Sequence, residues 1–181
     1  MRFTPTRLAD VILVEHDVHG DARGYFLETW RADAFERAGI DAHFCQDNYT
    51  RSNAGVLRGL HYQVSQPQGK LVRVSRGAAF DVAVDLRRSS PGFGQWVGVE
   101  LSEDNKRSLW IPPGFAHGFF VTGDCAEFIY RCTAYYSPAD ERTILWNDPE
   151  LGIEWPLGGA HPVVSEKDAA GTPLGEAEVY A

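Results

Sequence analysis

Residues 79–86 have the sequence Ala79-Phe80-Asp81-Val82-Ala83-Val84-Asp85-Leu86, and their pattern is the clearest indication of the fold. Phe80, Val82, Val84 and Leu86 alternate with alanine or aspartate. A period of two is typical of a β-strand with one buried face. We therefore expect residues 79–86 to form a strand whose larger apolar side chains face a core.

Similar short segments, rich in β-branched and aromatic residues, recur on both sides of this stretch. They are residues 24–30, 55–63, 71–76, 96–101, 108–111, 117–121 and 126–133. Their spacing, interrupted by Gly, Pro, Asn and Asp, predicts an antiparallel sandwich or barrel. In the early part of the chain only residues 32–38 are predicted to be helical, with Gly39 as the C-terminal stop. The sequence therefore predicts an all-β fold with a few short peripheral helices.

The length of the chain suits a single domain. A chain of 181 residues can bury roughly 70% of the surface that its unfolded form exposes. We find no internal repeat and no linker, so we expect one domain over residues 1–181. Its core should cover about residues 11–157, and the polar, Gly-rich segment 158–181 should pack over that core.

Charge and cysteine content narrow the class of protein. A net charge of −8 and a pI near 5.2 argue against a surface for nucleic acid, which needs many Lys and Arg facing phosphates. Cys45, Cys125 and Cys132 are odd in number and lack CxxC spacing, so we expect reduced thiols. The apolar run at residues 11–14 is too short for a signal peptide, and no stretch reaches membrane-spanning length. A cytoplasmic protein without a membrane partner is expected.

Two histidines and a lysine stand on or beside predicted strands. His61 lies in the run 55–63, Lys70 begins the next segment, and His117 begins another. A lone histidine in a strand is more often a hydrogen-bonded structural residue than a catalytic one. Three such groups in neighbouring strands favour a functional site instead.

The spacing of Pro112, Gly114 and His117 resembles the second motif of the cupin barrels, whose antiparallel jelly roll agrees with the strand pattern. The first cupin motif supplies an H-x-H pair and a glutamate for a transition metal. Here the corresponding residues are His61, Tyr62 and Gln63, so the second histidine is missing. We therefore expect no bound metal and no other cofactor.

More specific blocks of sequence extend this resemblance over most of the chain. They are residues 46–48 (QDN), 56–63 (VLRGLHYQ), 68–73 (QGKLVR), 80–85 (FDVAVD), 103–107 (EDNKR), 113–119 (PGFAHGF) and 165–168 (SEKD). In this order and spacing they resemble the signature blocks of the dTDP-4-dehydrorhamnose 3,5-epimerases. The resemblance covers roughly residues 11–168 and implies a metal-free, cupin-type jelly roll.

The resemblance also implies a reaction. Its substrate is dTDP-4-dehydro-6-deoxyglucose, whose C4 ketone makes the hydrogens at C3 and C5 acidic by delocalising the carbanion as an enolate. Epimerisation needs a base, an acid on the opposite face and a positive group near the enolate oxygen. His61 matches the base, Asp168 its carboxylate partner, Tyr130 the acid and Lys70 the group near the oxygen. Without the SEKD block, Asp168 would be interpreted as a solvated tail residue.

Substrate-binding residues follow from the same resemblance. They are Arg23, Glu28, Gln46, Asp47, Asn48, Arg58, Lys70, His117, Tyr136, Glu141 and Lys167, with Tyr136 stacking on the thymine. Arginine suits a diphosphate because its planar fork donates two hydrogen bonds. Family members are homodimers, and we expect the N-terminal region with Arg23 and Glu28 to reach the neighbouring subunit. Otherwise Arg23 is a solvated turn residue.

Strict alternation would place Arg58 and His61 on opposite faces of one strand. A bulge at Gly59 would bring them to the same face, or Arg58 would reach in from the rim of the pocket. The sequence also leaves other functions open: a sibling enzyme that epimerises C3 or C5 alone, a cupin that binds a nucleotide sugar without turnover, and a metal-dependent oxygenase. The oxygenase is disfavoured by Tyr62 and Gln63.

Overall fold

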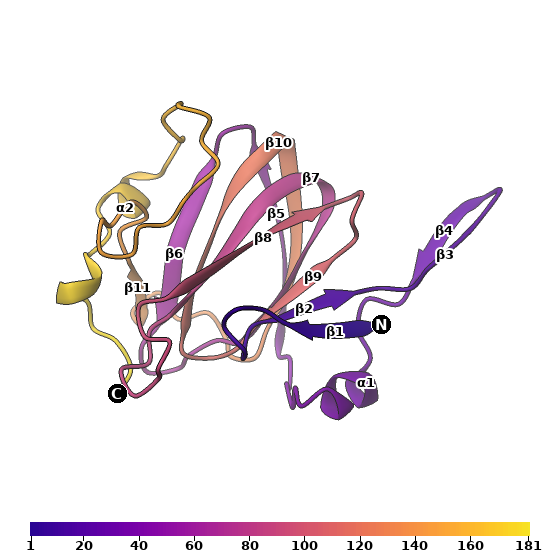
Figure 1. Cartoon of the computed structure of the whole chain (residues 1–181), viewed down its shortest axis with the longest axis horizontal. Coiled ribbons are helices and arrows are strands. Elements are labelled where there is room, and N and C mark those ends of the chain that lie inside the picture. Colours follow the sequence, from indigo (N-terminus) through magenta and orange to yellow (C-terminus); the bar gives the residue numbers. More distant parts are fainter.

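The computed structural model describes residues 1–181, and antiparallel strands make up most of its regular structure (Figure 1). The strands are β1 (Arg2–Pro5), β2 (Ile12–Glu15), β3 (Val18–Asp21), β4 (Gly24–Leu27), β5 (Gln46–Asn53), β6 (Leu57–Gln63), β7 (Lys70–Asp85), β8 (Trp96–Ser102), β9 (Ser108–Ile111), β10 (Phe115–Cys132) and β11 (Glu141–Thr143). The helices are α1 (Ala32–Arg37), α2 (Glu166–Ala169) and the 3₁₀ turn η1 (Leu174–Glu176). The predicted all-β fold is confirmed, and the predicted helix at 32–38 is α1 followed by Gly39 in the left-handed region.

Two long strands, β7 and β10, organise the molecule. They pair with each other along their lengths, and each has a different outer neighbour at its two ends. The first half of β10 pairs with β6 and the second half with β5, while β7 pairs first with β9 and then with β8. Each long strand therefore passes from one layer of a sandwich into the other, as in a jelly roll.

These continuous strands correct the expectation of separate short ones at 71–76 and 79–86 and at 117–121 and 126–133. The interruptions in the pattern are bends inside single strands. The register of β10 against β7 shifts between Val121 and Ala126, opposite Gly77. Gly77 has φ +77°, and a Cβ there would lie 1.8 Å from the carbonyl oxygen of Cys125. Only glycine fits this crossing point.

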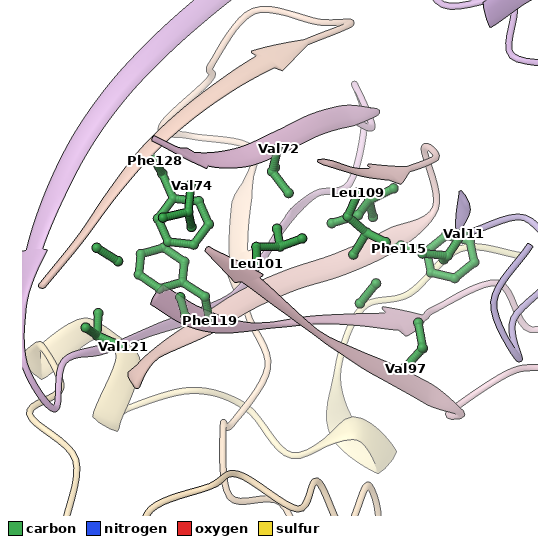
Figure 2. Packing of buried hydrophobic residues seen from close by; sticks show 14 of the residues in the cluster. Val11, Val72, Val74, Val97, Leu101, Leu109, Phe115, Phe119, Val121 and Phe128 are labelled. Atoms are coloured by element: carbon green, nitrogen blue, oxygen red, sulfur yellow. The ribbon is translucent and has the colours of Figure 1, made fainter. Parts of the chain in front are cut away.

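The main core lies between the two layers (Figure 2). Val72 and Val74 of β7 meet Phe128 of β10, and Phe119 stacks on Phe128 with ring centroids 4.1 Å apart. Burying aromatic and branched side chains of this size contributes about 1.5–3 kcal/mol each. The same two phenylalanines also line the cavity described below, so the core directly supports the site.

The decisive stretch at 79–86 is buried on both faces, which corrects the expectation of one buried face. Val82, Val84 and Leu86 lie on the face that the C-terminal segment covers. They pack there against Ile144, Leu151 and Leu174. Ala79 and Ala83 face the core between the layers, and Asp81 is also fully buried. The second face is covered because the chain after β11 returns across it.

The C-terminal segment is tied to β6 and β11 by backbone hydrogen bonds. Leu57 N–H donates to Val163 O, and Thr172 N–H donates to Thr143 O, both at 2.9 Å. On the other layer, α1 buries Phe35 against Val14 and Trp110. The β3–β4 hairpin instead projects from the body of the molecule (Figure 1). No helix is both long enough and apolar enough to span a bilayer.

Candidate active site

A cavity of about 330 Å³ is lined by side chains from β5, β6, β7, β10, β11 and the loop that precedes β11. Its polar lining includes most of the side chains that the sequence singled out. They are Gln46, Asn48, Arg58, His61, Lys70, His117, Tyr130, Tyr136 and Glu141. Segments far apart in the chain thus converge on one space.

Arg58 and His61 share this cavity because β6 contains one extra residue. Arg58 pairs with Phe119 of β10 and His61 pairs with His117, so Gly59 and Leu60 together lie opposite Gly118. Phe119 and His117 are two apart in β10 and face the same side, and their partners therefore do so too. Gly59 has φ +115°, and its added Cβ would be 2.6 Å from Gly118 Cα. Of the two alternatives that the sequence allowed for Arg58, the structure therefore contains the bulge at Gly59.

His61 is paired with Asp168 from the C-terminal segment. The ring Nε2–H donates to Asp168 Oδ1 at 2.6 Å, and the His61 side chain is 26% exposed against 5% for Asp168. Ser165 caps α2 by accepting the Asp168 N–H at 3.1 Å, which fixes the backbone that carries the carboxylate. Burial acts to raise the pKa of Asp168, but the hydrogen bond and charge of His61 outweigh it and hold the pKa below its usual value.

The carboxylate of Asp168 therefore stays ionised at neutral pH, stabilises a protonated His61 and holds one ring nitrogen. The second ring nitrogen is left to exchange a proton with a ligand. This is the arrangement required of a general base whose conjugate acid must be stabilised.

A second pair joins His117 to Asp81 inside the sheet. The His117 Nε2–H donates to both carboxylate oxygens of Asp81, at 2.9 and 3.1 Å, and Asp81 is completely buried. His117 was predicted to lie at the site, whereas Asp81 was not. An aspartate that alternates with valines in a strand looks like a solvent-facing residue, and only the second covering layer reveals that it is buried.

Tyr130 and Lys70 enter the cavity from the other half of the long strands. Phe128 and Tyr130 are two apart in β10 and both line the cavity, while Lys70 pairs directly with Cys132. Burial raises the pKa of Tyr130, so the phenol keeps its proton at neutral pH, and Arg58 opposes part of that rise. Burial lowers the pKa of Lys70, partly offset by Cys132 and by the charges of Glu141 and Asp81.

One end of the cavity is formed by Tyr136 and Glu141. The Tyr136 hydroxyl donates to Glu141 Oε2 at 2.9 Å, and Lys167 makes an ion pair with the same oxygen. Burial acts to raise the pKa of Glu141, but its bonds to Lys167 and Tyr136 lower it overall. Lys167 pairs with Glu141 at the cavity but is not among its lining residues. α2 thus supports two lining residues at once, Glu141 through Lys167 and His61 through Asp168.

Three residues predicted for the site lie elsewhere in this chain. Asp47 alternates to the opposite face of β5 from Gln46 and Asn48, and it lines a separate hollow beside Arg131. Arg23 is in the turn of the projecting hairpin, paired with Asp21 and 89% exposed. Glu28 lies at the base of the hairpin within 3.7 Å of Arg31. Within one chain, the hairpin residues do not reach the cavity.

Other lining residues were not identified as site residues from the sequence. They are Thr50, Gln68, Gly118, Phe119, Phe128 and Cys132. Thr50 and Cys132 follow by period two from Asn48 and Tyr130, a signal that could have found them. Ser52, two further along β5, is 3% exposed and accepts a hydrogen bond from Arg58 Nε at 2.9 Å, which holds the guanidinium at the cavity.

The cavity therefore combines a histidine paired with a carboxylate, a protonated phenol, a lysine and an arginine. His61 and Tyr130 belong to different halves of the sandwich, since β6 pairs with the start of β10 and Tyr130 lies near its end. No group of three or more His, Cys, Asp or Glu side chains is arranged around a common point as metal ligands would be. The donors that are present suit proton transfer next to an anionic ligand.

Comparisons with known proteins agree with this chemistry. The family model described as dTDP-4-dehydrorhamnose 3,5-epimerase matches residues 5–176. A protein of that name from Pseudomonas aeruginosa is 56% identical over 99% of both chains. The dTDP-6-deoxy-D-glucose-3,5-epimerase of Legionella pneumophila, solved with dTDP-4-keto-L-rhamnose, superposes with a TM-score of 0.95 at 50% identity and covers 98% of this chain and 94% of its own.

A more distant structure is a 3'-monoepimerase from Streptomyces bikiniensis, solved with dTDP-quinovose. It is 34% identical, with a TM-score of 0.88, and the match covers 94% of this chain and 87% of that one. The predicted cupin-type fold and the resemblance drawn from the sequence are both confirmed. The chain belongs to the dTDP-4-dehydrorhamnose 3,5-epimerase family.

Proposed function

We propose that this chain converts dTDP-4-dehydro-6-deoxy-D-glucose to dTDP-4-dehydro-L-rhamnose by epimerising C3 and C5, in the biosynthesis of dTDP-L-rhamnose. The observation that carries the proposal is the His61–Asp168 pair, which shares one cavity with Tyr130 and Lys70. A site that only bound a nucleotide sugar would need no base and no acid. We further propose that residues 1–181 act as one catalytic domain.

Each step of the reaction has a group to perform it. His61 removes the proton next to the ketone, and Asp168 stabilises the imidazolium that results. The electron pair moves onto the C4 oxygen, where the Lys70 ammonium stabilises the enolate. Tyr130 then donates a proton from the opposite face, which inverts the carbon. The raised pKa of Tyr130 keeps the phenol protonated, and therefore able to donate, at neutral pH.

The nucleotide binds at the end of the cavity formed by Tyr136 and Glu141. Arg58 grips the diphosphate, Tyr136 stacks on the thymine, and Gln46, Asn48, Glu141 and Lys167 bind the remaining polar groups of the dTDP moiety. His117 binds the sugar through Nδ1, the ring nitrogen that Asp81 leaves free. For Asp47, whose side chain points away from this cavity, we propose a role through the backbone of β5.

Arg23 and Glu28 lead to a proposal about assembly. Val18, Tyr25 and Phe26 of the projecting hairpin are all at least 45% exposed, an arrangement that suits burial against another protein. We propose a homodimer in which the hairpin of each subunit carries Arg23 and Glu28 to the other subunit's cavity. A cytoplasmic location is part of the proposal, supported by three free cysteines.

Solvent exchange tests the reaction and separates it from its rivals. The protein is incubated with the ketosugar in deuterated water, and NMR counts the exchanged positions. Deuterium at both C3 and C5 with formation of the L-rhamno product supports the proposal. Exchange at one carbon alone would identify a monofunctional epimerase, as in the Streptomyces relative, and binding without exchange would identify a non-catalytic protein.

Mixing two inactive variants tests the assembly. In a mixed dimer of Arg23→Ala and His61→Asn subunits, one cavity has an intact His61 and receives an intact Arg23 from its neighbour. Activity should therefore return on mixing, up to about half the wild-type value per mixed dimer. The control mixes His61→Asn with Tyr130→Phe, whose residues lie in the same chain's cavity, and should recover nothing. Equal results in the two mixtures would contradict the exchange of hairpins.

A further inference from the structure

The loop that carries Tyr136 is held by the amide side chains of three glutamines. Residues 133–140 connect β10 to β11, and Ala134 to Ser137 belong to no helix or strand. Gln68 Nε2 donates to Ala134 O at 2.7 Å, and Gln46 Oε1 accepts the Tyr136 N–H at 2.9 Å. The third glutamine is Gln63, at the end of β6.

Gln63 holds the residues on both sides of Tyr136. Its Nε2 donates to Tyr135 O at 3.2 Å and to Gln66 O at 2.9 Å, and its Oε1 accepts the Ser137 N–H at 2.8 Å. The side chain is only 2% exposed, so these bonds form away from competing water. Since buried amide groups lose free energy when left unpaired, the bonds impose one backbone path on the loop.

The ring of Tyr136 contrasts with this fixed backbone. Tyr136 is 51% exposed and Tyr135 is 68% exposed, so side-chain packing does little to restrain the loop. The Tyr136 side chain itself makes one hydrogen bond, from its hydroxyl to Glu141. The position of the ring at the cavity is therefore set mainly by the backbone, and hence by the glutamines.

We infer that Gln63 is a positioning residue that preorganises Tyr136 to stack on the nucleobase. It occupies the place at which a metal-binding cupin has the second histidine of its H-x-H pair. In this chain the side chain at that position bonds to the loop that carries Tyr136, two residues after the proposed base His61. This inference rests on the proposed function, because it takes Tyr136 to be the stacking residue.

Preorganisation predicts an effect on binding and not on chemistry. If the loop samples other backbone conformations, ordering it on binding reduces the binding free energy of the nucleobase, while His61, Tyr130 and Lys70 keep their positions. Gln63→Met keeps the length of the side chain and removes all three hydrogen bonds. We expect the Kd for dTDP and the KM for the ketosugar to rise about tenfold, with kcat at saturation within twofold of wild type.

The experiment measures dTDP binding by calorimetry together with kcat and KM. Gln63→Asn, which retains an amide but withdraws it by one methylene, is the second variant and should show the same split if Gln63→Met folds poorly. Gln95→Met is the matched control, because Gln95 also donates to a backbone carbonyl, Pro91 O at 3.3 Å, on the exposed surface. The control should leave all three constants unchanged.

A double variant makes the test specific to Tyr136. In a Tyr136→Ala protein the stacking ring is gone, so adding Gln63→Met should weaken dTDP binding no further. Full additivity of the two changes, or a fall in kcat with unchanged KM, would overturn the inference. Wild-type protein that binds no dTDP would contradict the proposed function and the inference with it. Wild-type binding that Gln63→Met and Gln63→Asn leave intact would contradict the inference alone.

Discussion

Two histidine–carboxylate pairs lie next to each other in the cavity wall, and they are assembled in different ways. His61 and His117 are direct partners in the register of β6 and β10. Asp81 reaches His117 from the neighbouring strand β7, 36 residues earlier in the chain, whereas Asp168 reaches His61 from the far end of the chain, 107 residues later. The first pair is part of the sheet, and the second exists only once the C-terminal segment has docked.

The difference in exposure matches the difference in assembly. The side chains of the His117–Asp81 pair are 11% and 0% exposed, while that of His61 is 26% exposed. A proton shuttle must meet its substrate and change its charge, which suits the more open pair. A ring that only binds the sugar benefits from a rigid, buried carboxylate that fixes its orientation. The same two residue types can therefore serve two tasks in one cavity.

Removing each imidazole should give the largest contrast. His61→Asn should abolish both epimerisation and solvent exchange, a loss of about 10²–10⁴-fold in kcat, because no carbanion forms without a base. His117→Asn should cost only about two- to tenfold, because one neutral hydrogen bond of about 0.5–1.5 kcal/mol to the sugar is lost. Steady-state rates with the ketosugar check both. His161→Asn, in an exposed stretch of the tail, is the control. Equal losses in the first two variants would remove the distinction between the pairs.

Replacing each carboxylate should separate activity from stability. Asp168→Asn removes the charge that stabilises the imidazolium, and kcat should fall roughly 10²-fold or more, as expected for a histidine that loses its carboxylate. Asp81→Asn should instead mainly lower the free energy of unfolding, by about 1–3 kcal/mol, since it disturbs a fully buried pair. For a chain of this length that is a fall in Tm of roughly 2–4 °C per kcal/mol. Asp124→Asn, on the exposed surface, should change neither. The reverse pattern would mean that the roles of the pairs have been exchanged.

Lys70 extends the comparison to a cation that lacks such a carboxylate pair. Burial lowers the pKa of Lys70, so this lysine loses its charge at a lower pH than an exposed lysine would, while burial raises the pKa of Tyr130 and keeps the phenol protonated to higher pH. We expect an alkaline limb in kcat that begins below pH 10.5, the ordinary pKa of lysine, and falls by about 10²–10³-fold as enolate stabilisation is lost. Lys70→Arg keeps its charge and should move that limb to higher pH. A limb at the same pH in both proteins would assign it to another group.

The smallest expected effect is that of chelation. One ring nitrogen of each histidine is occupied by a carboxylate, and no third ligand completes a metal site around them. Exhaustive treatment with a chelator should therefore leave the rate unchanged. Activity that is lost on chelation and restored by one particular metal ion would show that the pairs serve as ligands instead.

The sequence predicts best those features of the site that depend on neighbouring residues, and worst those that depend on contacts between distant segments of the chain. The alternation at 79–86 is local and predicted a strand correctly, and Gly59 correctly marked a possible bulge between Arg58 and His61. The burial of Asp81 depends on a layer contributed by the C-terminal segment, which periodicity does not describe. Strand β5 was missed because residues 46–53 contain no aliphatic side chain and only one aromatic one, Tyr49. The pairing of His61 with Asp168 came from resemblance alone.

The most direct test of the central claim concerns Tyr130, because the account requires a base and an acid on opposite faces of the sugar. Tyr130→Phe keeps the aromatic ring and removes only the hydroxyl, and Tyr49→Phe, on the exposed face of β5, is its control. With His61 intact the enolate still forms, but it mostly regains a proton from His61 on the original face. NMR in deuterated buffer follows deuterium wash-in and epimer formation together. We predict a higher ratio of wash-in to epimer in Tyr130→Phe than in wild type and in Tyr49→Phe, and an unchanged ratio would contradict the account by showing that another group is the acid.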